Sequence, residues 1–143
     1  MLTKITGAAV TGIDAITVTV EVAVSRGLAF TLVGLPDTAV KESYQRVLSA
    51  MNECGFKYPH LNIVVNLSPA DVRKEGAAYD LPIAVGILVA ADYIKPVVDL
   101  SRYMMMGELS LDGSLRPVRG VLPMAIKARA DHLDGIIVPA DNA

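Results

Sequence analysis

Hydrophobic and polar residues alternate along residues 15–24, and this pattern predicts a half-buried β-strand. Its apolar positions are Ile16, Val18, Val20, Val22 and Val24. Residues 3–11 are also rich in Val, Ile and Thr, and residues 12–14 suit a hairpin between the two strands. Further strands are expected over residues 28–33, 61–67 and 135–139.

Three segments repeat their apolar residues at helical spacing. Residues 38–54 form the first expected helix, with Asp37 as its N-cap, Gly55 at its C-terminal end, and an outward face that includes Arg46. Residues 80–93 are apolar nearly all round, which predicts a helix buried on several sides. Asp80 suits its N-cap and Pro82 its first turn. The third helix is expected over residues 122–132.

A hairpin is expected between residues 104–109 and 114–118, because Asp112-Gly113 between them is a strong turn signal. Strands come first along the chain and then mix with helices. The order predicts an α+β, or mixed α/β, fold in which helices pack on a sheet.

Length and composition suit one domain over residues 1–143. Apolar residues make up 52% of the chain and charged residues 20%, so the chain should fold. Its formal net charge of −2 argues against a stand-alone nucleic-acid module, although a local basic patch stays open. No secretory h-region and no run long enough to span a bilayer occur, so a cytoplasmic protein without a membrane partner is expected. The chain stops where another helix could begin, which suggests a piece of a longer protein.

The usual catalytic and ligand-binding motifs are not found. There is no P-loop pattern and no Gly-x-Gly-x-x-Gly, so no cofactor site is expected within these residues. Cys54 is interpreted as core filler, and His60 and His132 as isolated surface residues rather than zinc ligands. No pair of carboxylates suggests general acid–base chemistry.

The loop over residues 68–76 brings Ser68, Asp71 and Lys74 close together in sequence. A Ser–Lys dyad would need an amine that burial has deprotonated. Lys74 lies between Arg73 and Glu75, where solvent is expected to keep it protonated. The favoured interpretation is therefore a turn in which Ser68 or Asp71 bonds to local backbone.

Three longer segments, residues 33–43, 65–85 and 107–124, together resemble one family. They are similar to the N-terminal domain of the magnesium-chelatase-like AAA+ ATPases, also called the YifB or ComM family. The resemblance implies a domain like the Lon protease domain, with a ribosomal-protein-S5-domain-2-like fold. It also implies that an AAA+ module follows, which would carry ATP and Mg and would form a ring with neighbouring subunits. The ComM branch is associated with natural transformation and recombination, as a branch-migration helicase.

The resemblance to Lon can be followed at two sites. Residues 74–77 match the run before the nucleophilic serine of Lon, and the serine position falls on Ala78. Residues 119–121 match the turn before the catalytic lysine, and the lysine position falls on Leu122. A methyl and an isobutyl group cannot attack a carbonyl or take a proton, so no catalytic residue is expected in this domain.

The leading hypothesis is a non-catalytic accessory domain that supports ring assembly or DNA handling. Its candidate contacts with DNA or with a neighbouring subunit are Arg73, Lys74, Arg116 and Arg119. The favoured interpretation of these cations is a solvated loop or inter-subunit ion pairs, because exposed charges define function only weakly. Two alternatives stay open: a peptidase that uses Ser68 and Lys74, and a scaffold that only oligomerises.

Overall fold

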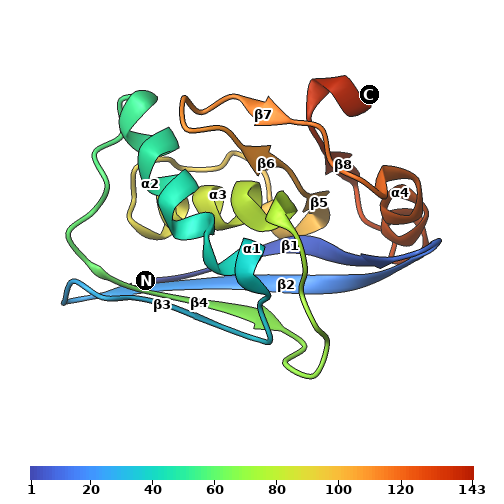
Figure 1. Ribbon diagram of the computed structural model, residues 1–143, viewed down its shortest axis with the longest axis horizontal. Helices are drawn as coiled ribbons and strands as arrows, with labels where there is room; N and C mark the ends of the chain where they lie inside the picture. Colours follow the sequence, from blue (N-terminus) through green and yellow to red (C-terminus); the bar gives the residue numbers. More distant parts are fainter.

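The computed structural model describes all residues, 1–143, and is built on a six-stranded sheet (Figure 1). The strand order is β3-β4-β2-β1-β5-β8. The strands are β1 (Leu2–Thr11), β2 (Asp14–Ser25), β3 (Phe30–Val33), β4 (Asn62–Ser68), β5 (Tyr103–Met105) and β8 (Gly135–Ile137). Strand β2 is antiparallel to both β1 and β4, and the remaining neighbours pair in parallel. The sheet is therefore mixed.

The helices and a small second sheet complete the fold. The α-helices are α1 (Thr38–Lys41), α2 (Ser43–Glu53), α3 (Asp80–Ala90) and α4 (Val121–Ala130). Short 3-10 turns are η1 (Ala77–Tyr79), η2 (Leu100–Arg102) and η3 (Ala140–Asn142). The second sheet pairs β6 (Glu108–Leu109) with β7 (Leu115–Arg116). Helices packed on a mixed sheet confirm the expected fold class.

Strands β1 and β2 form the long hairpin that the alternating pattern predicts. Their register runs from Leu2 opposite Ala23 to Thr11 opposite Asp14. Val18, Val20 and Val22 are fully buried, as expected, whereas Val24 is partly buried and Ile16, near the hairpin turn, is exposed. The turn passes through Gly12 at a φ of 61°, a conformation that glycine adopts without a steric penalty.

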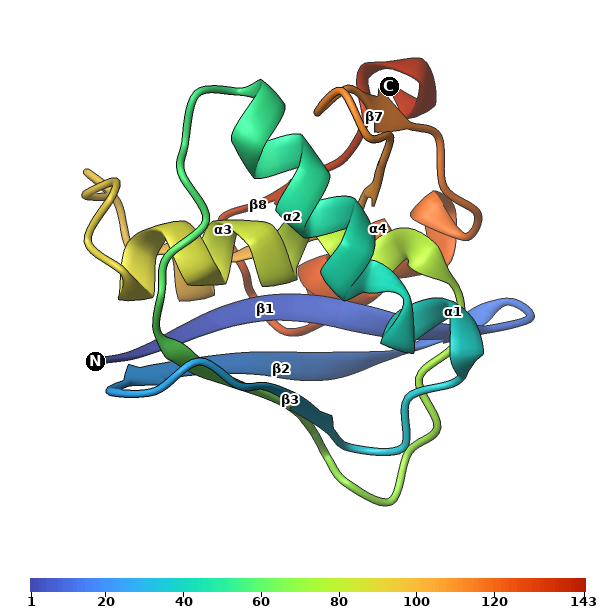
Figure 2. The same ribbon diagram turned by 60° about the vertical axis from the view of Figure 1, so that its left-hand side comes forward.

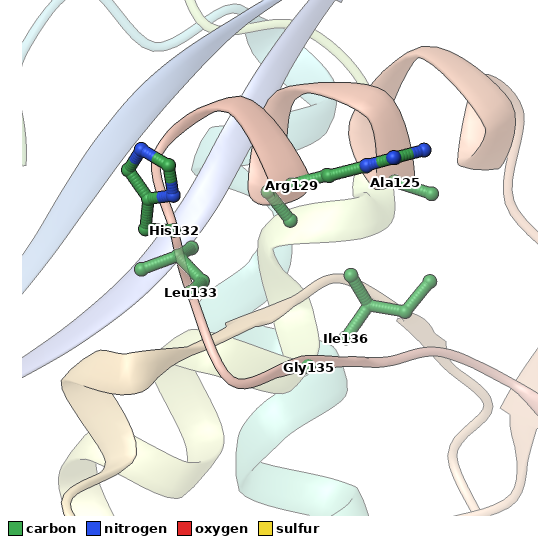
Figure 3. A pocket seen from close by; sticks show the side chains of 7 residues that line it. Ala125, Arg129, His132, Leu133, Gly135 and Ile136 are labelled. Carbon is green, nitrogen blue, oxygen red and sulfur yellow. The ribbon is translucent and has the colours of Figure 1, made fainter.

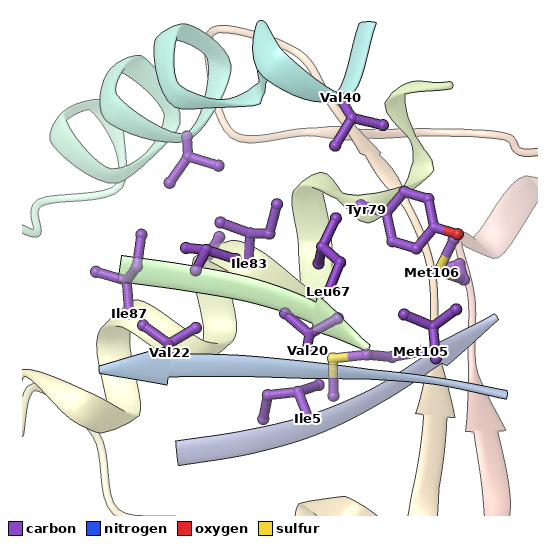
Figure 4. Close-up of a cluster of buried hydrophobic side chains, with 14 of the residues drawn as sticks. Ile5, Val20, Val22, Val40, Leu67, Tyr79, Ile83, Ile87, Met105 and Met106 are labelled. Carbon is purple, nitrogen blue, oxygen red and sulfur yellow. The ribbon is translucent and has the colours of Figure 1, made fainter. Parts of the chain in front are cut away.

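Helix α3 lies between the sheet and α2, as Figure 2 shows. Its contact with the sheet is close at Gly86, where an added Cβ would lie 2.5 Å from the Cγ2 atom of Val22. Ile83 and Ile87 are fully buried and face the apolar side chains of β1 and β2 (Figure 4). The nearly continuous apolar sequence of this helix follows from contacts on both sides, as expected.

Helix α4 covers the opposite face of β1 and β2. The hydroxyl of Thr17, whose side chain points away from α3, donates to the carboxylate of Asp131 at the end of α4. That bond lowers the pKa of Asp131. Because helices cover both faces of β1, residues 5–9 are buried without interruption, and this strand lacks the simple alternation of β2.

Two elements expected from the sequence, a helix and a hairpin, are each split into separate pieces in the structure. The helix expected over residues 38–54 is broken at Glu42, next to the point where the hydroxyl of Ser43 donates to the carbonyl of Val40 at 2.6 Å. Asp37 caps α1 through a 2.8 Å bond from the amide of Val40, as predicted. Gly55, at a φ of 88°, follows the last residues of α2, also as predicted.

The hairpin expected over residues 104–118 is divided at Gly107. The amide of Gly107 donates to the carbonyl of Ala78 at 2.8 Å, and its carbonyl accepts from the amide of Leu81 at 3.0 Å. These bonds hold the chain against the start of α3. Residues 103–105 consequently join the main sheet, and only residues 108–109 pair with 115–116.

A buried ion pair joins α2, α3 and β6. The carboxylate of Asp80 is fully buried and lies 2.6 Å from Nε and 3.1 Å from Nη2 of Arg46. It also accepts from the amide of Leu109 at 3.0 Å. Burial raises the pKa of Asp80, and the bonds from Arg46 and Leu109 act in the opposite direction. The pair in turn raises the pKa of Arg46.

Two sequence-based expectations are wrong at this ion pair. Asp80 does not cap α3: Tyr79 holds the cap position without a side-chain bond, and the Asp80 carboxylate turns to Arg46 instead. Arg46 does not face outward, since its side chain is only 19% exposed and also donates to the carbonyl of Ala39. An ion pair across 34 residues has no local signal in the sequence.

We expect Asp80→Asn to destabilise the chain by about 3–5 kcal/mol, because it leaves a half-buried guanidinium without its countercharge. Urea denaturation, followed by circular dichroism, measures the change in the free energy of unfolding. The matched control is Glu42→Gln, which removes the exposed carboxylate 3.8 Å from the same guanidinium and should change stability by less than about 0.5 kcal/mol. Equal effects of the two substitutions would contradict the assigned role of Asp80.

Candidate functional site

A cleft of about 990 Å³ opens beside the end of β1. One wall is the segment from Val72 to Tyr79, and the other contains residues 117–120. Residues 8–12, at the end of β1 and the start of its hairpin turn, form a third side. The cleft thus lies among the segments that carry the predicted candidate residues.

The first wall is tied to the chain before α1. Lys74 forms a parallel bridge with Pro36, in which its amide donates to Leu35 and its carbonyl accepts from Asp37, both at 2.9 Å. The carboxylate of Asp37 also accepts from the amide of Gly76 at 3.1 Å. Asp37 therefore has a second role beyond the cap predicted from sequence, and it fixes the wall.

Lys74 is buried, so the expectation that its amine is solvated, and is kept protonated by solvent, is wrong in its premise. Side chains of an extended segment alternate in direction, so Arg73 and Glu75 face the cleft while Lys74 points into the protein. Its Nζ donates to the carbonyl of Pro69. Burial lowers the pKa of Lys74, and the charge of Asp71 opposes this shift.

Ser68 and Lys74 do not form a hydrogen bond in this structure. The amine of Lys74 uses the Pro69 carbonyl instead, and neither Ser68 nor Lys74 lines the cleft. Ser68 ends β4 opposite Thr19. The geometry that a Ser–Lys nucleophile requires is therefore not formed between these two side chains.

The four candidate cations separate into three kinds. Lys74 is buried, so its ammonium cannot meet a partner at the surface, and this part of the prediction is corrected. Arg73 is exposed and pairs with Glu75 at 3.0 Å, and Arg116 pairs with Glu108 at 3.6 Å. Arg119 lines the cleft and has no carboxylate within salt-bridge distance. Whether these three arginines bind DNA or a subunit stays a prediction.

Comparison with known proteins identifies the family. The model of the family described as subunit ChlI of Mg-chelatase matches residues 20–142. The chain belongs to this family. The resemblance seen in the three sequence segments is thereby confirmed.

Two named relatives match nearly the whole chain, and a third matches about seven tenths of it. It is 46% identical to Competence protein ComM of Haemophilus influenzae over 133 residues, which are 92% of the chain and 26% of that protein. It is also 46% identical to Uncharacterized protein YifB of Escherichia coli over 132 residues, again 92% of the chain and 26% of the relative. The chain thus spans about a quarter of the length of these relatives. Lon protease 2 of Bacillus subtilis is 29% identical over 102 residues, 71% of the chain and 18% of that protein.

The two Lon-like positions of this ChlI-family chain lie at or near the cleft. Ala78 is in η1, lines the cleft, and accepts from the amide of Gly107 through its carbonyl. Leu122 is in the first turn of α4, two residues after Gly120, and is 71% exposed. The cleft lining contains no Ser, Cys, His or Lys side chain.

The other residues singled out in the sequence lie elsewhere. Cys54 is exposed at the end of α2, so its interpretation as core filler is wrong. His60 and His132 are exposed, as predicted. His132 borders a second hollow of about 500 Å³ between α4 and β8, together with Arg129 and Ile136 (Figure 3). No three His, Cys, Asp or Glu side chains group as metal ligands, and no helix is long and apolar enough to cross a membrane.

We expect Lys74→Met to be at least as stable as the wild type at pH 7, because the wild type buries a charge without a paired carboxylate. The folded state of the wild type releases the Lys74 proton at a lower pH than the unfolded state does. Wild-type stability should therefore rise, relative to the variant, as pH increases toward the ordinary lysine pKa of about 10.4.

Urea denaturation at several pH values between 7 and 10 measures the difference between the two chains. Lys41→Met, on the exposed side of α1, is the matched control and should show no such trend. If the stability of the wild type relative to Lys74→Met stays constant or falls as pH increases, the assignment is contradicted.

Proposed function

We propose that this chain is a non-catalytic accessory domain of a magnesium-chelatase-like AAA+ ATPase. The observation that carries the proposal is the lining of the cleft, which contains no Ser, Cys or Lys for the chemistry of a Lon-type pair. Its carboxylates, those of Asp37, Glu75 and Glu108, are bonded to backbone amides or paired with arginines. Ala78 and Leu122, at the positions where Lon-type enzymes have Ser and Lys, support the same conclusion. Such a domain contributes contact surfaces and leaves the chemistry to another part of the protein.

In this proposal an AAA+ module in the remaining length of the protein binds ATP and Mg and assembles into a homo-oligomeric ring. The relatives are about four times as long as the chain, which gives room for such a module. The domain supports the assembly of the ring or guides DNA. The printed name of the Haemophilus relative links that protein to competence, and we extend this link to a role of the present protein in recombination of incoming DNA.

One observation favours a second function, a peptidase that uses Ser68 and Lys74. Burial lowers the pKa of Lys74, as a lysine base requires. The hydrogen bonds argue the other way, because the Lys74 amine donates to the carbonyl of Pro69 and makes no bond with Ser68. The accessory role is therefore the better supported of the two.

DNA handling predicts that the chain binds DNA through Arg73, Arg116 and Arg119. The test is fluorescence anisotropy with labelled single-stranded and branched DNA at several salt concentrations. Reversing all three charges to Glu should abolish binding. For the wild type and a single strand, a plot of the logarithm of the association constant against the logarithm of the salt concentration should have a slope of roughly −0.7 per phosphate contact.

The matched control reverses three exposed cations outside the cleft, Arg26, Lys57 and Arg129. It makes the same change in net charge and should retain binding. If the cleft variant and the control bind DNA equally, or if the wild type shows no salt-dependent binding, DNA contact at this cleft is rejected.

A further inference from the structure

The second wall of the cleft, residues 117–120, has few backbone bonds of its own. It connects β7 to α4, and β7 pairs with β6 at only two residues. The wall takes part in one backbone–backbone hydrogen bond, in which the carbonyl of Gly120 accepts from the amide of Met124 at 3.1 Å. A segment with so few bonds opens easily unless another contact holds it.

The side-chain amide of Asn142 supplies that contact. Its Oδ1 atom accepts from the amide of Val118 at 2.8 Å, and its Nδ2 atom donates to the carbonyl of Val118 at 2.9 Å. An amide side chain carries both an acceptor and donors, so it can bond both backbone groups of one residue, as a paired strand does. The two bonds join positions that are 24 residues apart in the chain.

Asn142 belongs to the turn η3, which follows β8. Figures 1 and 2 both show this turn near β7, at whose end the wall begins. Pro139, the residue before the turn, is buried, and the carbonyl of Ile137 in β8 accepts from the amide of Met106 at 3.2 Å. The base of the turn is thus fixed to the edge of the main sheet, and Asn142 connects the wall to that edge.

The wall also lies against the end of β1 at Gly120. This residue has a φ of 80°, and an added Cβ would lie 2.5 Å from the Cγ1 atom of Val10. Such a contact prevents closer approach but resists separation only weakly, because single dispersion contacts are small. Arg119 lies between this contact and Val118, so the two bonds of Asn142 are the polar contacts that keep it in place.

We propose that Asn142 is a latch on the cleft, which holds the wall and Arg119 in place while bonded to Val118 and releases them when η3 shifts. Asn142 does not line the cleft, so it is a positioning residue. A shift of about 1 Å breaks both bonds, because hydrogen bonds weaken steeply beyond about 3.2 Å. The effect of the latch on binding at Arg119 rests on the proposed function, whereas its effect on the wall does not.

The test compares two substitutions at Asn142 with one beside it. Asn142→Ala removes both bonds, and Asn142→Leu removes them while nearly keeping the volume of the side chain. The matched control is Asp141→Ala, because Asp141 is exposed in the same turn and its side chain forms no hydrogen bond or salt bridge. Spin labels are attached through Arg73→Cys and Arg119→Cys, one on each wall, in chains that also carry Cys54→Ser.

Electron paramagnetic resonance measures the distribution of distances between the two labels across the cleft. The distribution should be narrow with Asn142 present and with Asp141→Ala, and at least about twice as wide in both Asn142 variants. In chains without labels, NMR should show that the Val118 amide exchanges about tenfold faster in the Asn142 variants, because it loses its acceptor. The thermal midpoint should change by no more than a few degrees.

Three results would overturn the latch: distance distributions that stay narrow in both Asn142 variants, equal broadening in Asp141→Ala, or a thermal midpoint lowered by more than about 10 °C in both variants. The last result would show that Asn142 holds the whole fold and not the wall alone.

Fluorescence anisotropy with labelled single-stranded DNA separates the latch from the proposed function. Binding that is several-fold weaker in both Asn142 variants, and unchanged in Asp141→Ala, supports the transmission from η3 to Arg119. Unchanged binding beside a wider wall overturns that transmission. If no chain binds DNA while the wall still widens, the latch is supported and only the proposed DNA contact is refuted.

Discussion

The buried pair of Arg46 and Asp80 is the interaction on which the arrangement of the cleft depends. It is the one place where α2, the start of α3 and β6 meet through polar side chains, and the amide of Leu109 completes it. An unpaired charge in this position would be costly, so the three elements are held in one arrangement. The adjacent η1 turn, with Ala78 and Tyr79 in the cleft wall, is positioned by this arrangement.

The same polar framework explains how the cleft could keep its shape without a catalytic function. Asp37 ties the wall to the start of α1, and Gly107 ties it to the chain that follows β5. These bonds use backbone groups and carboxylates that lie outside any reactive pair. The wall of the cleft is therefore held by bonds that need no nucleophile or base in its lining.

Local patterns predicted most of the elements, because the alternation of β2 and the apolar sequence of α3 are set by which faces are buried. The cleft was only partly predictable. The burial of Lys74 follows from its bridge to Pro36, a pairing across 38 residues that its charged sequence neighbours conceal. The end of β5 was not predictable either, because the tertiary bonds of Gly107 to Ala78 and Leu81 determine it. The helical spacing predicted that Arg46 lies on an outer face, because local spacing does not reveal Asp80, its partner 34 residues away.

The central claim is that this domain carries no activated serine nucleophile, either in the cleft or at Ser68. Treatment of the chain with a serine-reactive fluorophosphonate, followed by intact mass spectrometry and peptide mapping, tests it most directly. The account predicts an unmodified mass under conditions in which an active serine peptidase is fully labelled. An adduct on Ser68 that disappears in Lys74→Ala would contradict it, because a nucleophile activated by the buried amine would then be present.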